Sequence, residues 1–138
     1  MDKKIYAGTV VKYRDKFLFC KRNSNMPYGG MWSIVGGGVE NNENIKEAAV
    51  REFLEETNIE VTRDKLKLIG IIPRYNRNGK KYKGKMFVFL MNVDEKIIPD
   101  LDLAVDGEEH TKCGYFTLES IEQYNVDRHI LKLLKIIN

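Results

Sequence analysis

The apolar positions of the chain repeat every second residue in some segments and every third or fourth residue in others. Segments of the first kind are rich in β-branched and aromatic side chains and are bounded by polar turns, so they predict strands. The predicted strands are residues 5–13, 17–22, 31–35, 66–73, 86–93 and 113–118. The third of these leads directly into three consecutive glycines, at positions 36–38.

A helical period begins after the glycines. Asn44 is the expected N-cap, Glu47 its capping-box partner, and Asn58 the C-terminal cap, since asparagine tolerates the left-handed conformation. One face of this helix is mostly apolar and is expected to pack on the sheet; it comprises Ala49, Val50, Phe53, Leu54 and Thr57. A short helix is expected over residues 119–124. Asp127 is then expected to cap a last amphipathic helix, whose inward positions are Ile130, Leu131, Leu134 and Ile137.

Strands on both sides of a central helix, followed by a C-terminal helix, predict an α/β sandwich with a mixed sheet between helices. At 138 residues the chain is expected to form a single domain over residues 1–138. The pattern alone does not distinguish this architecture from other mixed folds.

Composition narrows the range of functions. The net charge is only +3, so no general affinity for polyanions such as duplex nucleic acid is expected. No apolar run approaches the roughly 18 residues of a membrane span, and no signal peptide is recognised. Cys20 and Cys113 are far apart in sequence and form no CxxC motif, so we expect two reduced packing thiols in a cytoplasmic protein.

The central helix carries an acidic cluster. Glu52, Glu55 and Glu56 lie three and four residues apart or side by side, so they share one face of the helix. Like charges at these spacings destabilise a helix by about 0.2–0.5 kcal/mol per pair, and a divalent cation such as Mg²⁺ would reverse that repulsion. Arg51 is expected to reach Glu47 and Glu55. The competing interpretation is an ordinary solvated helix face.

Spacing makes the cluster more specific. The segment resembles the Nudix box, G-x5-E-x7-R-E-U-x-E-E-x-G-U with U a bulky aliphatic residue. The positions that match are Gly37, Glu43, Arg51, Glu52, Glu55, Glu56 and Ile59, while Phe53 stands at the first U and Asn58 replaces the last glycine. The resemblance covers 23 of the 138 residues and implies the Nudix α/β/α sandwich and a metal-dependent pyrophosphohydrolase.

The resemblance also implies the roles of individual residues. Glu52, Glu55 and Glu56 would bind Mg²⁺, or Mn²⁺ in its place, and Glu52 would double as the base. A backbone carbonyl of Gly36 or Gly37 would be a further ligand. Arg51 and Glu43 would orient these groups. A distant loop would supply one more carboxylate, with Glu109 as the first choice and Glu108 and Glu40 as alternatives.

The implied substrate is a nucleoside diphosphate linked to another group: a nucleoside triphosphate, a dinucleoside polyphosphate or ADP-ribose. The basic stretch at 74–85 is expected to form a hairpin turning at Asn78-Gly79, with Arg74, Tyr75 and Lys81 as candidate substrate contacts. Trp32 is either a core residue or a cleft residue. Two alternatives stay open, an RNA 5′-end pyrophosphohydrolase and a non-catalytic nucleotide sensor. A monomer or a homodimer is expected.

Overall fold

The computed structural model describes residues 4–75 and 81–138. A mixed sheet runs through these residues in the order β3-β2-β1-β6-β5, while β4 pairs with β1 and β7 with β2. The strands are β1 (Lys4–Tyr13), β2 (Lys16–Arg22), β3 (Trp32–Ser33), β4 (Val35–Gly38), β5 (Lys67–Tyr75), β6 (Tyr82–Asn92) and β7 (His110–Phe116).

Strand β1 is the centre of the sheet. It pairs in parallel with β6 from Lys4 to Lys12 and antiparallel with β4 and β2. Ala7, Val10 and Val11 are fully buried, as expected for a strand covered on both faces.

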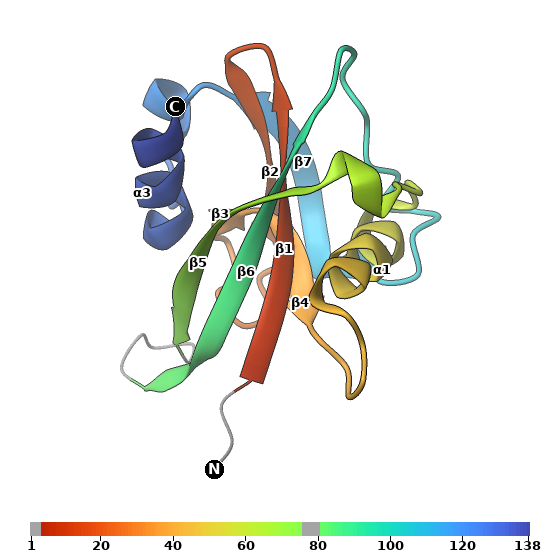
Figure 1. Cartoon of the computed structure of the whole chain (residues 1–138). Helices are drawn as coiled ribbons and strands as arrows, with labels where there is room; N and C mark the ends of the chain where they lie inside the picture. Colours follow the sequence, from red (N-terminus) through yellow and green to blue (C-terminus); the bar gives the residue numbers. More distant parts are fainter. Residues whose placement is uncertain (1–3, 76–80) are drawn as a thin grey trace.

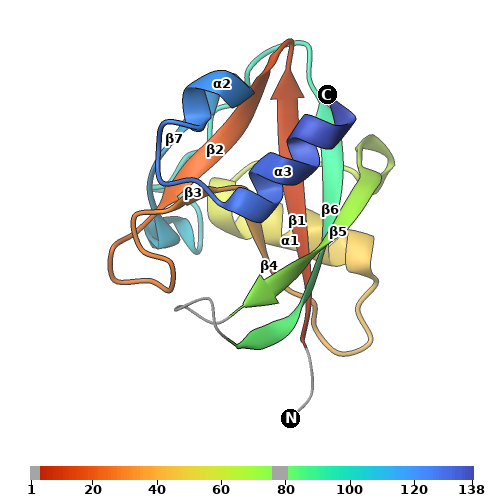
Figure 2. The ribbon, with the colours of Figure 1, turned by 90° about the vertical axis from the view of Figure 1, so that its left-hand side faces the viewer.

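Helices cover the two faces of the sheet. Helix α1 (Ile45–Thr57) lies on one face, and α2 (Leu118–Ile121) and α3 (Arg128–Ile137) pack against the core of the other. In Figure 1 the sheet separates α1 from α3, and in Figure 2 α3 crosses in front of the sheet with α1 behind it. Two 3₁₀ turns, Arg63–Lys65 and Gly107–Glu109, complete the regular structure. The predicted α/β sandwich is confirmed.

The helix ends follow the predicted caps, with one exception. The Asn44 side chain accepts hydrogen bonds from the backbone N–H groups of Lys46 and Glu47, and Asn58 has a left-handed φ of 61°. Asp127 caps α3 in the same way as Asn44 caps α1. The capping-box role of Glu47 is wrong, because its carboxylate instead accepts from Arg63 Nη1 at 2.7 Å.

The glycines lie within a strand. The predicted strand 31–35 is interrupted at Ile34, so that β3 pairs with β2 while β4 carries the glycines along β1. A Cβ on Gly36 would stand 2.6 Å from the Ala7 carbonyl oxygen, so only glycine lets β4 approach β1 this closely. Strand β7 begins at His110, three residues earlier than predicted. Pro73 lies inside β5, which is an edge strand of the described sheet.

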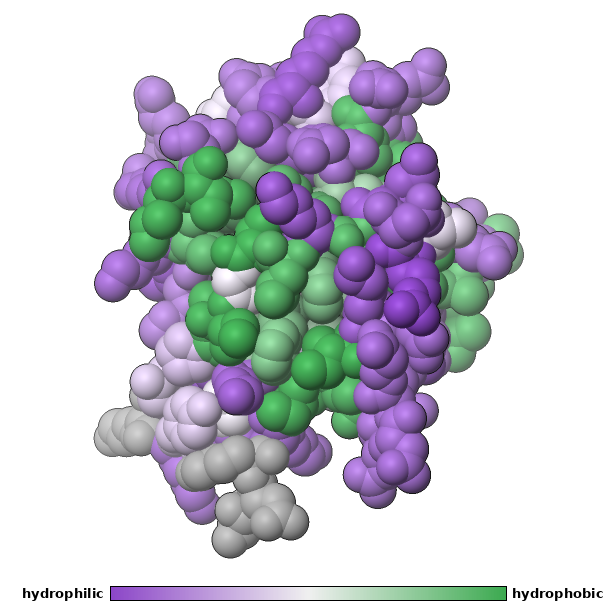
Figure 3. Space-filling view, in the orientation of Figure 1, coloured by the Kyte–Doolittle hydropathy of each residue, from purple (hydrophilic) through white to green (hydrophobic). Residues whose placement is uncertain are grey.

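Two expected core positions are exposed. Leu54 of α1 is 42% exposed and Ile137 of α3 is 40% exposed, because each lies on the outer side of its helix. Trp32, at 8% exposure, packs edge to face on Phe116 and Tyr124. Apolar residues also reach the surface between α3 and α1 (Figure 3). Strand β5 carries two exposed apolar residues, Leu68 and Ile71.

The two cysteines are paired. Cys20 of β2 lies opposite Cys113 of β7, and the structure joins them in a disulfide. The prediction of two separate packing thiols is therefore wrong: positions far apart in sequence meet because β7 returns to the edge of β2. No helix within the described ranges is long and apolar enough to cross a membrane.

Candidate metal and nucleotide site

Arg51 is the hub of the acidic face of α1. Its guanidinium donates to both carboxylate oxygens of Glu43 (2.8 and 3.0 Å) and to the Gly38 carbonyl oxygen (2.9 Å). It also donates to Glu52 at 2.9 Å and to Glu55 at 3.1 Å. One side chain thus holds two of the candidate ligands and ties the loop before the helix to the end of β4. The expected contact with Glu47 is not among these bonds.

Glu52 lies directly against β4, the strand that carries the three glycines at positions 36–38 (here called the glycine strand). A Cβ built on Gly37 would stand 2.4 Å from the Glu52 carboxyl carbon, so the carboxylate occupies the space that any larger residue at position 37 would fill. This close approach brings a side chain from α1 and the backbone of β4 to the same point.

Glu56 is the most unusual residue of the cluster. Its side chain is 0% exposed, and neither carboxylate oxygen has a hydrogen-bond partner in the part of the chain that the structure describes. Burial raises its pKa well above the ordinary range, and the nearby carboxylates of Glu52 and Glu109 raise it further. An ionised carboxylate buried without a donor is costly, so the protonated form of Glu56 is favoured unless a cation accompanies it.

The neighbouring carboxyl groups show the same electrostatic crowding. Burial and the charge of Glu52 raise the pKa of Glu55, although Arg51 acts in the opposite direction. Burial also raises the pKa of Glu109, whose carboxylate lies 3.4 Å from Arg22 Nη1. The charge of Asp106 adds to both shifts. Negative charge therefore accumulates here beyond what the described cations neutralise locally.

The residues present fit a divalent cation. Carboxylate oxygens are the ligands that Mg²⁺ and Mn²⁺ prefer, and the cluster offers the unpartnered oxygens of Glu56 and the Glu52 carboxylate seated on Gly37. Within residues 4–75 and 81–138, however, no three acidic, histidine or cysteine side chains already stand at metal-ligand spacing. Arg51 draws one oxygen each of Glu52 and Glu55 to itself. The donor set is thus suitable, while its final arrangement requires small side-chain movements.

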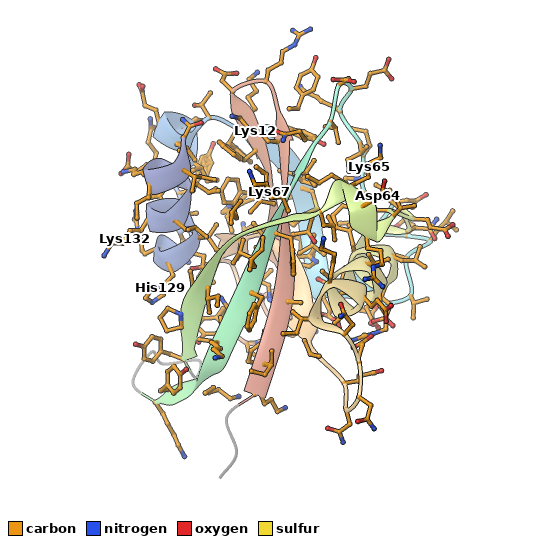
Figure 4. All side chains as sticks on the ribbon, in the orientation of Figure 1. Lys12, Asp64, Lys65, Lys67, His129 and Lys132 are labelled. Carbon is orange, nitrogen blue, oxygen red and sulfur yellow. A yellow bond between two sulfur atoms is a disulfide. The ribbon has the colours of Figure 1, made fainter. Side chains whose placement is uncertain are left out.

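A cleft opens beside the acidic cluster. A cavity of about 160 Å³ borders Gly36, Gly37 and Glu109, and it shares Tyr28 and Arg74 with a larger cavity of about 410 Å³. The larger cavity lies between the end of β5 and the start of α3. Its walls include Tyr75 and His129, whose rings stack at 5.7 Å. Figure 4 shows His129 at the first turn of α3. The cleft therefore joins an anionic end to an aromatic end.

The predicted substrate residues fall in different places. Arg74 and Tyr75 line the cleft, and Arg74 donates to Asp127 Oδ2 at 2.9 Å. Trp32 packs in the core and lines none of the cavities described above. Lys81 is an exposed residue next to the start of β6. Arg77, Lys80 and the Asn78-Gly79 turn lie outside the described residues. Of the alternative carboxylates, Glu108 and Glu40 are exposed, whereas Glu109 borders the cavity.

Sequence reasoning did not single out several cleft residues. Arg22, Tyr28 and Asp127 line the cleft, and Asp127 also accepts from Ser33 Oγ at 3.0 Å. The sequence predicted Asp127 only as the N-cap of the last helix. Arg22 ends a predicted strand, which is a common place for a functional side chain, but nothing local indicated that it faces the acidic cluster.

The sequence and the fold are both similar to those of known proteins. The model of the NUDIX domain matches residues 3–134. The fold is similar to the crystal structure of a MutT NUDIX hydrolase from Burkholderia pseudomallei, with a TM-score of 0.78 at 20% identity over 99% of both chains. The sequence is similar to an 8-oxo-dGTP diphosphatase of Proteus vulgaris, 37% identical over 65 residues, which cover 45% of this chain and 58% of that protein. It is also similar to an ADP-ribose pyrophosphatase of Methanocaldococcus jannaschii, 40% identical over 126 residues, which cover 91% of this chain and 68% of that protein.

Proposed function

Because the chain belongs to the NUDIX family, we propose that it hydrolyses a diphosphate linkage in a nucleoside triphosphate or a related nucleoside diphosphate derivative, with Mg²⁺ or Mn²⁺ as cofactor. One observation carries the proposal: the buried carboxylate of Glu56 has no partner in the described structure, and it lies near Glu52 and near Glu109, which borders the cleft. A purely structural helix face would not bury an unpaired acid.

The residues that would hold the ion are Glu52, Glu55, Glu56 and Glu109, together with a backbone carbonyl of Gly36 or Gly37. When bound, the ion neutralises phosphate charge and makes water more acidic. Glu52 is the candidate to take the proton from the attacking water, since its carboxylate lies against the glycine strand and faces the acidic cluster. Arg51 keeps Glu52 and Glu55 in place through its two hydrogen bonds.

The cleft supports a nucleotide as substrate. Arg22 and Arg74 line the part of the cleft next to the acidic cluster, where they are suited to the phosphates. The cavity of about 410 Å³ lies within the range typical of small-molecule sites, and its aromatic wall is suited to stacking on a base. Two relatives are named as an 8-oxo-dGTP diphosphatase and an ADP-ribose pyrophosphatase. Both named substrates contain a nucleoside diphosphate, so this part is common to the two candidate substrates.

The test is a substrate panel with each metal ion and with a chelator, the products being separated by chromatography. The panel holds canonical and oxidised nucleoside triphosphates, ADP-ribose, dinucleoside polyphosphates and 5′-triphosphate RNA. Glu55→Gln keeps the side-chain volume and removes one charge, so it should fold normally and lose at least about 100-fold in turnover, since even outer-shell changes cost 10- to 100-fold.

Glu47→Gln is the matched control, because Glu47 lies on the same helix but pairs with Arg63 away from the cluster. It should retain wild-type turnover. Binding of one nucleotide without metal-dependent cleavage of any member of the panel would refute the hydrolase and favour the sensor.

A further inference from the structure

His110 is a buried polar side chain that the proposed function does not use. It is the first residue of β7, directly after the 3₁₀ turn that carries Glu109. Its backbone position is fixed on both sides: its N–H donates to the Gly107 carbonyl oxygen, and it pairs with Arg22 across a bulge in β2. Only 1% of its side chain is exposed.

The imidazole faces the unpartnered carboxylate of Glu56. His110 Nδ1 lies 3.7 Å from Glu56 Oε1, and neither atom has a hydrogen-bond partner among the described residues. A shift of about half an ångström would bring the two atoms within hydrogen-bond range. Buried polar groups almost always have hydrogen-bond partners. Two unpartnered groups that face each other are therefore each other's natural hydrogen-bond partners.

We infer that His110 is a positioning residue for the metal site, its Nδ1–H donating to Glu56 Oε1 so that Oε2 is left to bind the divalent cation. The inference rests on the proposed function, since it assigns Glu56 as a ligand. A hydrogen bond to the distal oxygen of a metal-binding carboxylate fixes its rotamer and holds it in place for the ion. His110 touches neither substrate nor the reacting atoms in this arrangement.

A packing role makes different predictions. If His110 only filled space between β7 and α1, a well-packed apolar side chain would serve equally well for metal binding. It would also make the metal-free protein more stable, because a buried polar group without a partner would be removed. Metal affinity therefore separates the two roles more clearly than stability does.

The experiment measures the dissociation constant for Mn²⁺ by electron paramagnetic resonance, without substrate, in the wild type and two variants. His110→Leu removes the donor and should weaken Mn²⁺ binding about 10- to 100-fold while the metal-free protein stays folded. His110→Asn places an amide N–H close to the position of Nδ1 and should recover most of the affinity. Unchanged affinity in His110→Leu, or equal losses in both variants, would overturn the inference.

A second measurement does not depend on the folding of a variant. Long-range ¹H–¹⁵N spectra of the wild type with Mg²⁺ report which ring nitrogen of His110 carries the proton. The inference expects the proton on Nδ1, and a neutral ring protonated only at Nε2 would overturn it. Failure of the proposed function is distinct, because the wild type itself would then neither bind Mn²⁺ at this cluster nor hydrolyse nucleotides.

Discussion

Helices α1 and α3 cover opposite faces of the same sheet, but they use their buried sides differently. Helix α3 buries Ile130, Leu131 and Leu134. The buried positions of α1 include an ionisable residue, Glu56, beside Ala48, Ala49, Phe53 and Thr57, while its own Leu54 is left exposed.

This difference indicates how stability and chemistry are divided in the molecule. Helix α3 is amphipathic in the usual sense, so its contribution comes from apolar burial. Helix α1 gives up part of that contribution to bury an acid and to gather carboxylates around Arg51. Variants of the buried apolar side chains of α3 should therefore change stability without changing metal binding, whereas variants of the carboxylates of α1 should change metal binding.

The largest effect on stability is expected in α3. Leu134→Ala removes a fully buried side chain from the core cluster between α3 and the sheet. It should lower the free energy of unfolding by about 2–5 kcal/mol, as measured by urea denaturation. Mn²⁺ affinity of the folded protein should stay the same. A large loss of affinity at temperatures where the variant is folded would show that the two faces are coupled.

Glu56→Gln should raise the free energy of unfolding of the metal-free protein, whereas Leu134→Ala lowers it. Burial holds the pKa of Glu56 above its unfolded value of about 4.5, so the wild type loses stability as the pH rises beyond that value towards the raised pKa. The glutamine variant lacks this titration and should be about 1–3 kcal/mol more stable at pH 8, with a smaller gain at pH 5. Chelator-treated samples should be compared by thermal unfolding at both pH values. An equal gain in stability at both pH values would contradict the raised pKa of Glu56. Burial lowers the pKa of His110 to about 4, below both pH values, so the folded wild type keeps this ring neutral throughout the comparison.

Strand β4 offers a sharper test, because an added Cβ would meet a side chain at Gly37 but backbone at Gly36. Gly37→Ala would place its Cβ against the movable end of the Glu52 side chain, so it should weaken Mn²⁺ binding at least about 10-fold and change the free energy of unfolding by less than about 1 kcal/mol. Gly36→Ala would meet the backbone of Ala7 and should destabilise the fold more strongly. Calorimetry with and without Mn²⁺ measures both quantities. Equal behaviour of the two variants would contradict this distinction.

The smallest effect is expected on the exposed side of α1. The Glu47–Arg63 pair is more than half exposed at both partners, so Glu47→Gln should change the free energy of unfolding by less than about 0.5 kcal/mol. Chemical denaturation measures this value directly. A larger change would mean that the acidic face of α1 contributes to stability beyond the cluster around Arg51.

Local patterns predicted the local features well. The caps at Asn44, Asn58 and Asp127 are where the sequence places them, because capping depends on a few neighbouring residues. The expected capping box failed because a distant residue, Arg63, competes for the Glu47 carboxylate. A local motif states which bonds are available but not which partner the fold brings closer.

The parts of the site that the sequence did not predict come from distant segments. Arg22 and His110 meet through the pairing of β2 with β7, and the same pairing joins Cys20 to Cys113. No periodicity within a single segment contains this information. The approach of Glu52 to Gly37 is similar, since it depends on how α1 packs over β4. The box indicated the candidate residues, and the sheet topology decides what they face.

The parallel pairing of β1 with β6 also has a consequence for the order of folding. Lys4 lies opposite Gly84 and Lys12 opposite Asn92, so the central strand is translated long before its main neighbour. Until then β1, whose side chains are largely apolar or β-branched, can pair only with β2 and β4, along one of its two edges. Pairing between segments this far apart in sequence generally slows folding and leaves unpaired strand edges exposed to aggregation while it forms. The ribosome-bound chain should therefore need protection from aggregation until β6 has emerged from the exit tunnel.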